Sequence, residues 1–317
     1  MRWVLPVVTH LAYSPAFPTG HRFPMAKFQL LADWVRAEIP EAQFFSPDAP
    51  DFDAIRRVHS ADYVAAFQSG TLSPQALREI GLPWSEGLAV RTPLAVAGSL
   101  LTAELASTYG VACHLAGGTH HAHVDRGSGF CIYNDLAIIA RKRVAEGTSS
   151  RVLIFDCDVH QGDGTASILA QDAAIFTCSL HGERNFPVRR ARSDMDVELP
   201  DGLGDADYLA IVQSTWESVV AAFRPDFVIY DAGADVHTED VLGRLAITDQ
   251  GMYARDRFVL SACLAQQIPV ATVIGGGYAP DQNQLAARHG IVVRAARDAL
   301  VAEKSLDNHL HFENRLA

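Results

Sequence analysis

Several features that would define a protein class at once are missing from this sequence of 317 residues. It has no run of about 18 consecutive apolar residues that could span a bilayer. The first ten residues, MRWVLPVVTH, carry one basic residue and a short apolar run interrupted by Pro6, without a small-residue cleavage site. We interpret this segment as a first strand rather than a secretory signal, and we expect no membrane partner.

Cysteines are few, and positive charge is the minority sign. The five cysteines are odd in number and include no C-x-x-C pair, so we expect reduced thiols in a cytoplasmic protein. Lys and Arg number 26 against 37 Asp and Glu, a net charge of −11. This balance disfavours direct binding of nucleic acid and mildly favours cationic partners.

Short β-rich runs alternate with segments of helical periodicity along the chain. The runs are 111–118, 151–160, 173–181, 226–235 and 269–278, and the clearest helical stretches are 208–223 and 251–267. This alternation predicts an α/β fold, an open parallel sheet with helices on both faces. No linker or shift in composition divides the chain, so we expect one catalytic domain over 1–317, with loop-rich polar insertions at 40–54 and 182–206.

Unusual polar residues follow four of these predicted strands. His120 and His121 follow the first run, Asp158 and His160 end the second, Asp235 ends a third, and 275–278 (GGGY) ends a fourth. Ligands gather at the carboxyl ends of strands in open parallel sheets. The sequence therefore predicts a functional site at this edge.

Two carboxylates and one imidazole make up the predicted metal site. Asp158 and His160 alternate along an extended segment with Asp156, so they share one side of it, and Asp235 adds a third ligand from another strand. Such a set leaves a position open for water or substrate, and it suits zinc while also accepting Fe(II). The alternative is that these residues cap helices or lie solvated in loops.

The paired histidines are candidates for proton transfer. Beside a metal, one imidazole could remove a proton from water and return it to a leaving amine, with Asp156 and Asp163 as the carboxylates that orient the two rings. Tyr278 could donate its hydroxyl to a developing oxyanion, or it could simply pack after a strand. We expect His123 to be exposed or structural and His237 to be solvated.

In family order, the motifs GGTHHAHVDRGSGFCIYND, FDCDVHQGDG, TCSLH, DAGADVHTEDVLGRL and GGGY resemble the histone deacetylase family of the arginase/deacetylase fold. The resemblance implies one zinc ion held by Asp158, His160 and Asp235. It also implies the pairs His120–Asp156 and His121–Asp163, and Tyr278 as the oxyanion donor. In that scheme His121 is the main general base and acid, and His120 acts electrostatically.

The same resemblance implies a narrow tunnel for an acylated lysine or similar acylated amine. Gly129 and Phe130 would form one wall, Phe186 the opposite one, and Leu242 would lie near the rim. A potassium ion would lie close to the zinc, at Asp156, Asp158, His160, Ser179 and Leu180. Gln161 and the segment 78–87 are most similar to the smaller class IV branch, whereas Gly81 stands where other branches carry an Asp that clamps the substrate backbone.

Three other functions remain alternatives. A sibling branch hydrolyses acetylpolyamines and uses a Glu near the rim, where this chain has Leu242, although Glu239 and Asp240 lie close by in sequence. Guanidine hydrolysis by two manganese ions, as in arginase relatives, would need further Asp and His ligands. A non-catalytic binding module of the same fold would keep the pocket to sense a metabolite or recruit partners, but the presence of every catalytic position favours the enzyme.

Overall fold

A single parallel sheet organises the fold of the computed structural model, which describes residues 4–313. The eight strands run in the order β2-β1-β3-β8-β7-β4-β5-β6. They are β1 (Leu5–Val8), β2 (Ala42–Phe45), β3 (Val111–His114), β4 (Val152–Asp156), β5 (Ile175–Gly182), β6 (Met195–Leu199), β7 (Phe227–Asp231) and β8 (Val270–Val273). The inner strands are apolar runs such as VLIFD and FVIYD that are buried throughout, as expected for a sheet covered on both faces.

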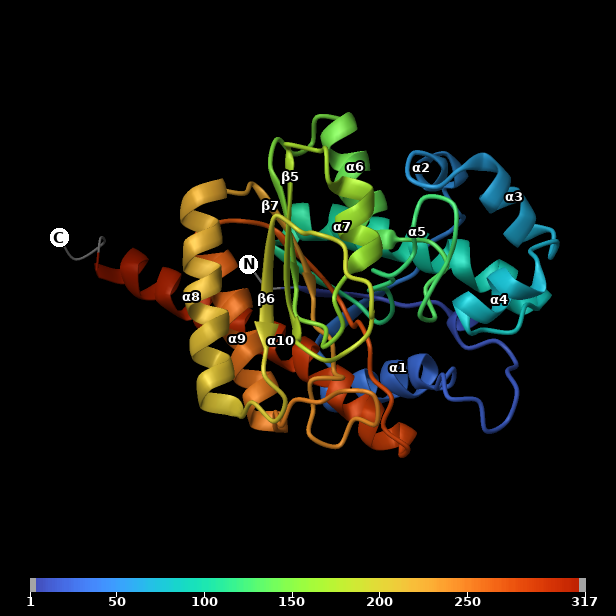
Figure 1. Ribbon diagram of the computed structural model, residues 1–317. Helices are drawn as coiled ribbons and strands as arrows, with labels where there is room; N and C mark the ends of the chain where they lie inside the picture. Colours follow the sequence, from blue (N-terminus) through green and yellow to red (C-terminus); the bar gives the residue numbers. More distant parts are fainter. Residues whose placement is uncertain (1–3, 314–317) are drawn as a thin grey trace.

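Helices cover both faces of this sheet (Figure 1). They are η1 (Leu11–Tyr13), α1 (Lys27–Glu38), α2 (Phe52–Arg56), α3 (Ala61–Gln68), α4 (Pro74–Ile80), α5 (Glu86–Tyr109), α6 (Asp135–Ala145), α7 (Asp163–Leu169), α8 (Asp205–Phe223), α9 (Asp249–Ala265) and α10 (Gln282–Glu313). Helices α5, α6 and α7 contact strands on one side, while α8, α9, α10 and α1 pack together on the other. The predicted fold class is thereby confirmed.

Helix α5 is a long and strongly apolar helix. Ser85 caps its start by accepting a hydrogen bond from the backbone N–H of Leu88, and Gly110 ends it at a φ of 88°. By length and composition α5 could cross a membrane, which the sequence analysis did not expect of any segment. However, 72% of its most apolar window is buried, and it contacts β1, β3 and β8 as a core helix does.

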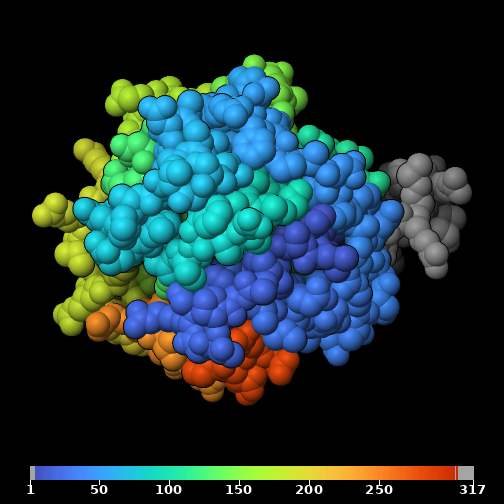
Figure 2. All heavy atoms as spheres, turned by 90° about the vertical axis from the view of Figure 1, so that its right-hand side faces the viewer, coloured from blue at the N-terminus to red at the C-terminus, as the bar shows by residue number. Residues whose placement is uncertain are grey.

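The main differences from the sequence-based prediction lie at the two edges of the sheet. The supposed insertion 40–54 contains β2 and the start of α2, and the insertion 182–206 contains β6. In β6 only alternate residues face inward, so its sequence MDVEL lacks the continuous apolar run that marks the inner strands. The first strand is confirmed at 5–8, and residues 1–3 of that prediction lie outside the described residues. Residues of α1 to α5, blue to blue-green, form most of the face in Figure 2.

Candidate active site

The carboxyl ends of the central strands bring the predicted side chains to one edge of the sheet. Asp156 ends β4 and lies opposite Ser179 of β5 and Asp231 of β7 in the strand register. The loops after β3 and β8 carry the paired histidines and the segment 275–278 to the same edge. An internal cavity of about 50 Å³ and a surface groove of about 970 Å³ meet there, and both are lined by His121, Gly129, Phe130 and Tyr278.

Asp158, His160 and Asp235 form the candidate metal centre. Their ligand atoms all lie within 4.8 Å of one another. Nδ1 of His160 is 3.0 Å from Oδ1 of Asp158 and 3.0 Å from Oδ2 of Asp235. Backbone N–H groups fix both carboxylates, because Val159 donates to Asp235 and Gly276 donates to Asp158. The structure therefore brings the three predicted ligands together from two strand ends.

The electrostatics of this centre suit a bound cation. Burial, followed by the charge of Asp158, raises the pKa of Asp235 to about 7. Burial would raise the pKa of Asp158 too, but the positive charge of His120 and the contact with His160 hold it well below its usual value. Two buried carboxylates that face one imidazole need positive charge between them, so a divalent ion such as zinc or Fe(II) fits this donor set.

Each of the paired histidines faces its own carboxylate. Nδ1 of His120 is 2.8 Å from Oδ2 of Asp156, and Nδ1 of His121 is 2.7 Å from Oδ1 of Asp163. The two Nε2 atoms are 3.2 Å apart and point toward the cavity side of the metal centre. The structure thus brings together both predicted histidine–aspartate pairs at hydrogen-bonding distance.

The two rings differ in charge. Burial alone would lower the pKa of His120, but the carboxylates of Asp156 and Asp158 outweigh it and hold that pKa well above the usual value. Burial and the neighbouring positive charge of His120 lower the pKa of His121 to about 4. The carboxylates around His120 therefore favour its protonated form, and the charge of His120 favours the neutral form of His121.

The expectation for His123 is half right. Its ring is buried rather than exposed, and Nε2 lies 3.2 Å from Oδ2 of Asp163, so it supports the carboxylate that orients His121. The backbone carbonyl of His123 accepts a hydrogen bond from Nδ1 of His59. The backbone N–H of Asn134 donates to Nε2 of the same His59 ring, which packs this loop against the domain. His123 is a structural residue of the site.

His237 is not solvated as expected. Only 6% of its surface is exposed, and its ring lies 3.3 Å from the carboxylate of Asp249. The loop after Asp235 folds back on α9, and this buries a histidine whose sequence context looks like an ordinary loop.

Asp231 is a site residue that sequence reasoning missed. It lies opposite Asp156 in the register and forms a second cluster with His120 and Asp156 whose ligand atoms also lie within 4.8 Å of one another. Neither carboxylate oxygen has a hydrogen-bond partner among the described residues, and burial followed by the charge of Asp156 raises its pKa well above the usual value. The signal was available, because Asp231 ends the strand four residues before Asp235.

Two side chains, Asp240 and Lys27, hold the loop that carries Tyr278. Asp240 accepts a hydrogen bond of 2.7 Å from the backbone N–H of Tyr278. Lys27 lies 3.4 Å from the carbonyl oxygen of Gly277 and 3.3 Å from Nε2 of His289. Burial, followed by the charges of Asp158 and Asp235, raises the pKa of the Tyr278 hydroxyl well above its usual value, so it keeps its proton. Sequence reasoning missed Lys27, which precedes the quoted motifs.

The predicted tunnel residues all line the outer groove, and two of them, Gly129 and Phe186, lie against His121. The ring of Phe186 meets His121 edge-on at 4.8 Å between centroids, and the ring of Phe130 lies 5.7 Å from that of Tyr278. Gly129 has a φ of 52°, and a Cβ atom there would be only 2.7 Å from Cδ2 of His121. Only glycine allows the wall to approach the base this closely. Leu242 lines the outer groove, as predicted for a rim residue.

The acidic residues near the rim do not face the groove as free charges. Asp240 is buried, and its oxygens accept backbone hydrogen bonds from Leu242, Gly243 and Tyr278. Glu239 pairs with Arg288. Neither residue lines the outer groove, so the two carboxylates give no direct support to a polycation site there, although the Glu239 side chain is 62% exposed.

The residues of the predicted potassium site lie at the end of β4, in the loop that follows it and on β5. Ser179 is opposite Asp156 in the register, and its hydroxyl is 2.9 Å from Nδ1 of His181. Leu180 is fully buried next to it. The side-chain amide of Gln161 donates hydrogen bonds to Asp196 of β6 and to the backbone carbonyl of Ala191, which links the loop after β4 to β6. A potassium ion here stays a prediction.

Comparison with solved structures defines the class of fold. The crystal structure of the HDA15 HD domain superposes with a TM-score of 0.75 and 23% identity, covering 94% of this chain and 92% of that one. The chain therefore has the arginase/deacetylase fold. A family model described as the histone deacetylase domain matches residues 21–293. The chain belongs to the histone deacetylase family.

Several curated proteins are similar to this chain in sequence. An uncharacterised protein of Picosynechococcus sp. is 51% identical over 295 residues, which are 92% of this chain and 98% of that protein. Histone deacetylase 2 of Arabidopsis thaliana is 34% identical over 186 residues, 58% of this chain and 48% of its own length. Acetoin utilization protein AcuC of Staphylococcus aureus is 34% identical over 261 residues, 74% of this chain and 66% of that protein.

Proposed function

We propose that this protein is a zinc-dependent amidohydrolase that removes an acyl group, acetyl or longer, from a lysine side chain or a similar amine. The observation that carries the proposal is the convergence of three parts on one hollow: the Asp158–His160–Asp235 centre, the two histidine–carboxylate dyads and Tyr278. Family membership and the relatives' printed names support the deacylase class.

Zinc bound by these ligands would polarise the amide carbonyl and acidify water. The chain's own residues supply the proton transfers. His121 takes a proton from the attacking water at Nε2, because its Nδ1 proton is held by Asp163. His121 then returns the proton to the amine nitrogen as the C–N bond breaks. Asp163 fixes the tautomer that makes this possible.

Two groups stabilise the negative charge that develops on the amide oxygen. His120 stays protonated beside Asp156 and places positive charge next to the reacting atoms. Tyr278 keeps its hydroxyl proton and donates it in a hydrogen bond to the oxygen. Phe186 packs against His121, Phe130 packs against Tyr278, and both rings line the groove, where their apolar faces suit an aliphatic amine stem. We propose a cytoplasmic enzyme closest to the class IV branch.

The other functions lack a supporting observation. The acetylpolyamine hypothesis rested on the overall negative charge and on Glu239 and Asp240, but neither residue lines the groove. The two candidate clusters share no residue, which gives no support to two ions held by a shared carboxylate as in a binuclear guanidine hydrolase.

A substrate panel tests the proposal. The zinc-loaded enzyme is offered acetyl, octanoyl and myristoyl groups on a lysine peptide and on a free polyamine, each with and without a chelator. We expect chelator-sensitive hydrolysis of the lysine substrates. Absence of turnover on every member, with zinc bound, would contradict the proposal and favour a binding module.

A further inference from the structure

The outer groove has a charge opposite to that of the whole chain. It is lined by six arginines, Arg22, Arg78, Arg126, Arg184, Arg189 and Arg244, and by one exposed carboxylate, Glu79. The chain carries 26 basic residues against 37 acidic ones. Nearly a quarter of its positive charge is therefore gathered around one opening, so net charge is a poor guide to the partner.

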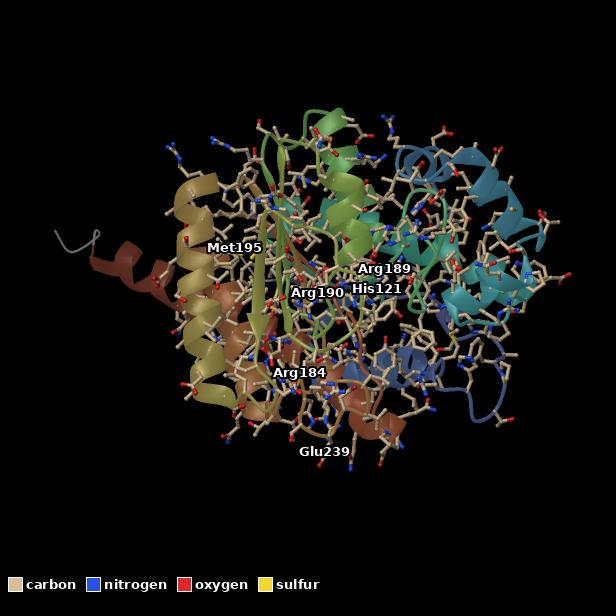
Figure 3. The ribbon with its side chains drawn as sticks, viewed as in Figure 1. His121, Arg184, Arg189, Arg190, Met195 and Glu239 are labelled. Carbon is tan, nitrogen blue, oxygen red and sulfur yellow. The ribbon has the colours of Figure 1, made fainter. Side chains whose placement is uncertain are left out.

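These arginines come from five separate segments. Arg22 precedes α1, Arg78 is in the last turn of α4, and Arg126 is in the loop between β3 and α6. Arg184 and Arg189 extend from the β5–β6 loop on the side of the sheet where His121 lies (Figure 3), and Arg244 comes from the loop after β7. A single charged loop would be an ordinary solvated surface, whereas here segments distant in sequence present the same charge around the acyl tunnel.

Neighbouring carboxylates neutralise only part of this charge. Arg126 lies 3.5 Å from Asp125, Arg184 lies 3.3 Å from Glu183, and Arg244 lies 3.3 Å from Asp201. Their side chains are 51%, 69% and 56% exposed, so these pairs are weak and easily exchanged. Within residues 4–313, Arg22, Arg78 and Arg189 have no carboxylate within 4.0 Å. The groove thus presents unpaired guanidinium groups that match carboxylates in geometry.

We propose that the natural substrate is an acylated lysine in a peptide segment whose flanking residues are acidic. This inference rests on the proposed amidohydrolase and names its substrate class. The acylated stem enters between Phe130 and Phe186, and the flanking carboxylates meet arginines on opposite sides of the groove, which extends well beyond the tunnel mouth. Lysine-rich segments and polyamines meet like charge at the same place.

Peptides that differ only in flanking charge test the inference. One acetyl-lysine peptide is made with two glutamates on each side, a second with glutamines and a third with lysines. We expect kcat/KM to fall in that order, with at least about a tenfold difference between the first and the third at low salt. The difference shrinks as salt is raised, because the screening length falls from about 10 Å at 0.1 M to about 3 Å at 1 M.

Arginine variants locate the effect. Arg78→Gln and Arg189→Gln should each reduce the ratio of glutamate-flanked to glutamine-flanked kcat/KM, and the double variant should reduce it further. Arg151→Gln is the matched control, because this exposed arginine precedes β4 and lies at the opposite edge of the sheet. It should leave the ratio unchanged.

Equal kcat/KM for the three peptides, or a preference for the lysine-flanked one, would overturn the inference while leaving the amidohydrolase intact. Binding of the same peptides to zinc-loaded His121→Ala, followed by fluorescence anisotropy, gives a readout that needs no turnover. Tighter binding of the glutamate-flanked peptide there supports the inference even if the proposed reaction is wrong. The part of the inference that places the acylated lysine in a peptide would be overturned by one further result. That result is faster hydrolysis of a small acidic N-acyl amine than of every peptide, with dependence on the same arginines.

Discussion

Replacing His121 with alanine is the sharpest perturbation of the proposed chemistry. Its Nδ1 is 2.7 Å from Asp163, and its pKa of about 4 keeps the ring neutral at pH 7, with a free lone pair on Nε2. A positioned acid or base contributes about 100- to 10,000-fold, or about 3–5 kcal/mol of barrier. We expect kcat to fall by that factor. The bound metal should be nearly unchanged, because the ring is not one of the three predicted ligands.

His123 supplies the matched control. It contacts the same carboxylate, at 3.2 Å from Oδ2 of Asp163, but from the outer side. His123→Ala should reduce kcat by less than about tenfold, and Asp163→Asn by about 10- to 100-fold, because the amide would favour the wrong tautomer of His121. The assay is steady-state hydrolysis of an acetyl-lysine peptide, with metal content measured on the same samples. Normal turnover in His121→Ala, or equal losses in both histidine variants, would refute the reasoning.

Three further predictions concern the tunnel, the fold and the metal. Gly129→Ala should reduce kcat/KM about 100-fold, because the added methyl group would displace His121. Gly147 has a similar positive φ but no atom within 4 Å of the position of a Cβ, so Gly147→Ala should lower only stability. Similar activity in both variants would count against the tunnel. Burial lowers the pKa of His59 from 6.5 to about 4. Between these two pH values the unfolded chain binds a proton that the folded chain does not bind. About 3 kcal/mol of stability, fully present above pH 6.5, is therefore lost as the pH falls toward 4. Urea unfolding at pH 7.5 and 5 should show a smaller loss in His59→Gln, and an equal loss would contradict this. A chelator should lower the Tm of the zinc-loaded protein. Bound zinc adds up to about 4 kcal/mol to the free energy of unfolding when free zinc is about 1,000 times Kd, and the chelator removes this contribution. It should not change the Tm of Asp235→Asn, and a Tm shift of the same size in that variant would place the ion elsewhere.

The inner half of the fold is predictable from sequence because its strands are continuous apolar runs. β4 and β7 bury every residue, so their patterns survive without tertiary information. The edge strands β2 and β6 are half-exposed, and pairing with β1 and β5 is what makes them strands. Local patterning cannot show such pairing, so both segments read as loops.

The candidate site follows the same division. Asp158, His160 and Asp235 are predictable because strand ends in a parallel sheet converge on one edge. Lys27 and Asp240 support the Tyr278 loop from α1 and from the loop after β7, and no spacing in the sequence links them to it. The basic groove also could not be foreseen, because its arginines lie in five segments and the total charge has the opposite sign.

Titration of zinc into the metal-free protein, with hydrolysis of an acetyl-lysine peptide followed at each addition, tests the central claim most directly. A single centre formed by Asp158, His160 and Asp235 predicts no turnover without metal, a linear rise and a break at one equivalent. Turnover that persists without metal would contradict the account, as would a break at two equivalents, which would indicate a binuclear site that includes the His120–Asp156–Asp231 cluster.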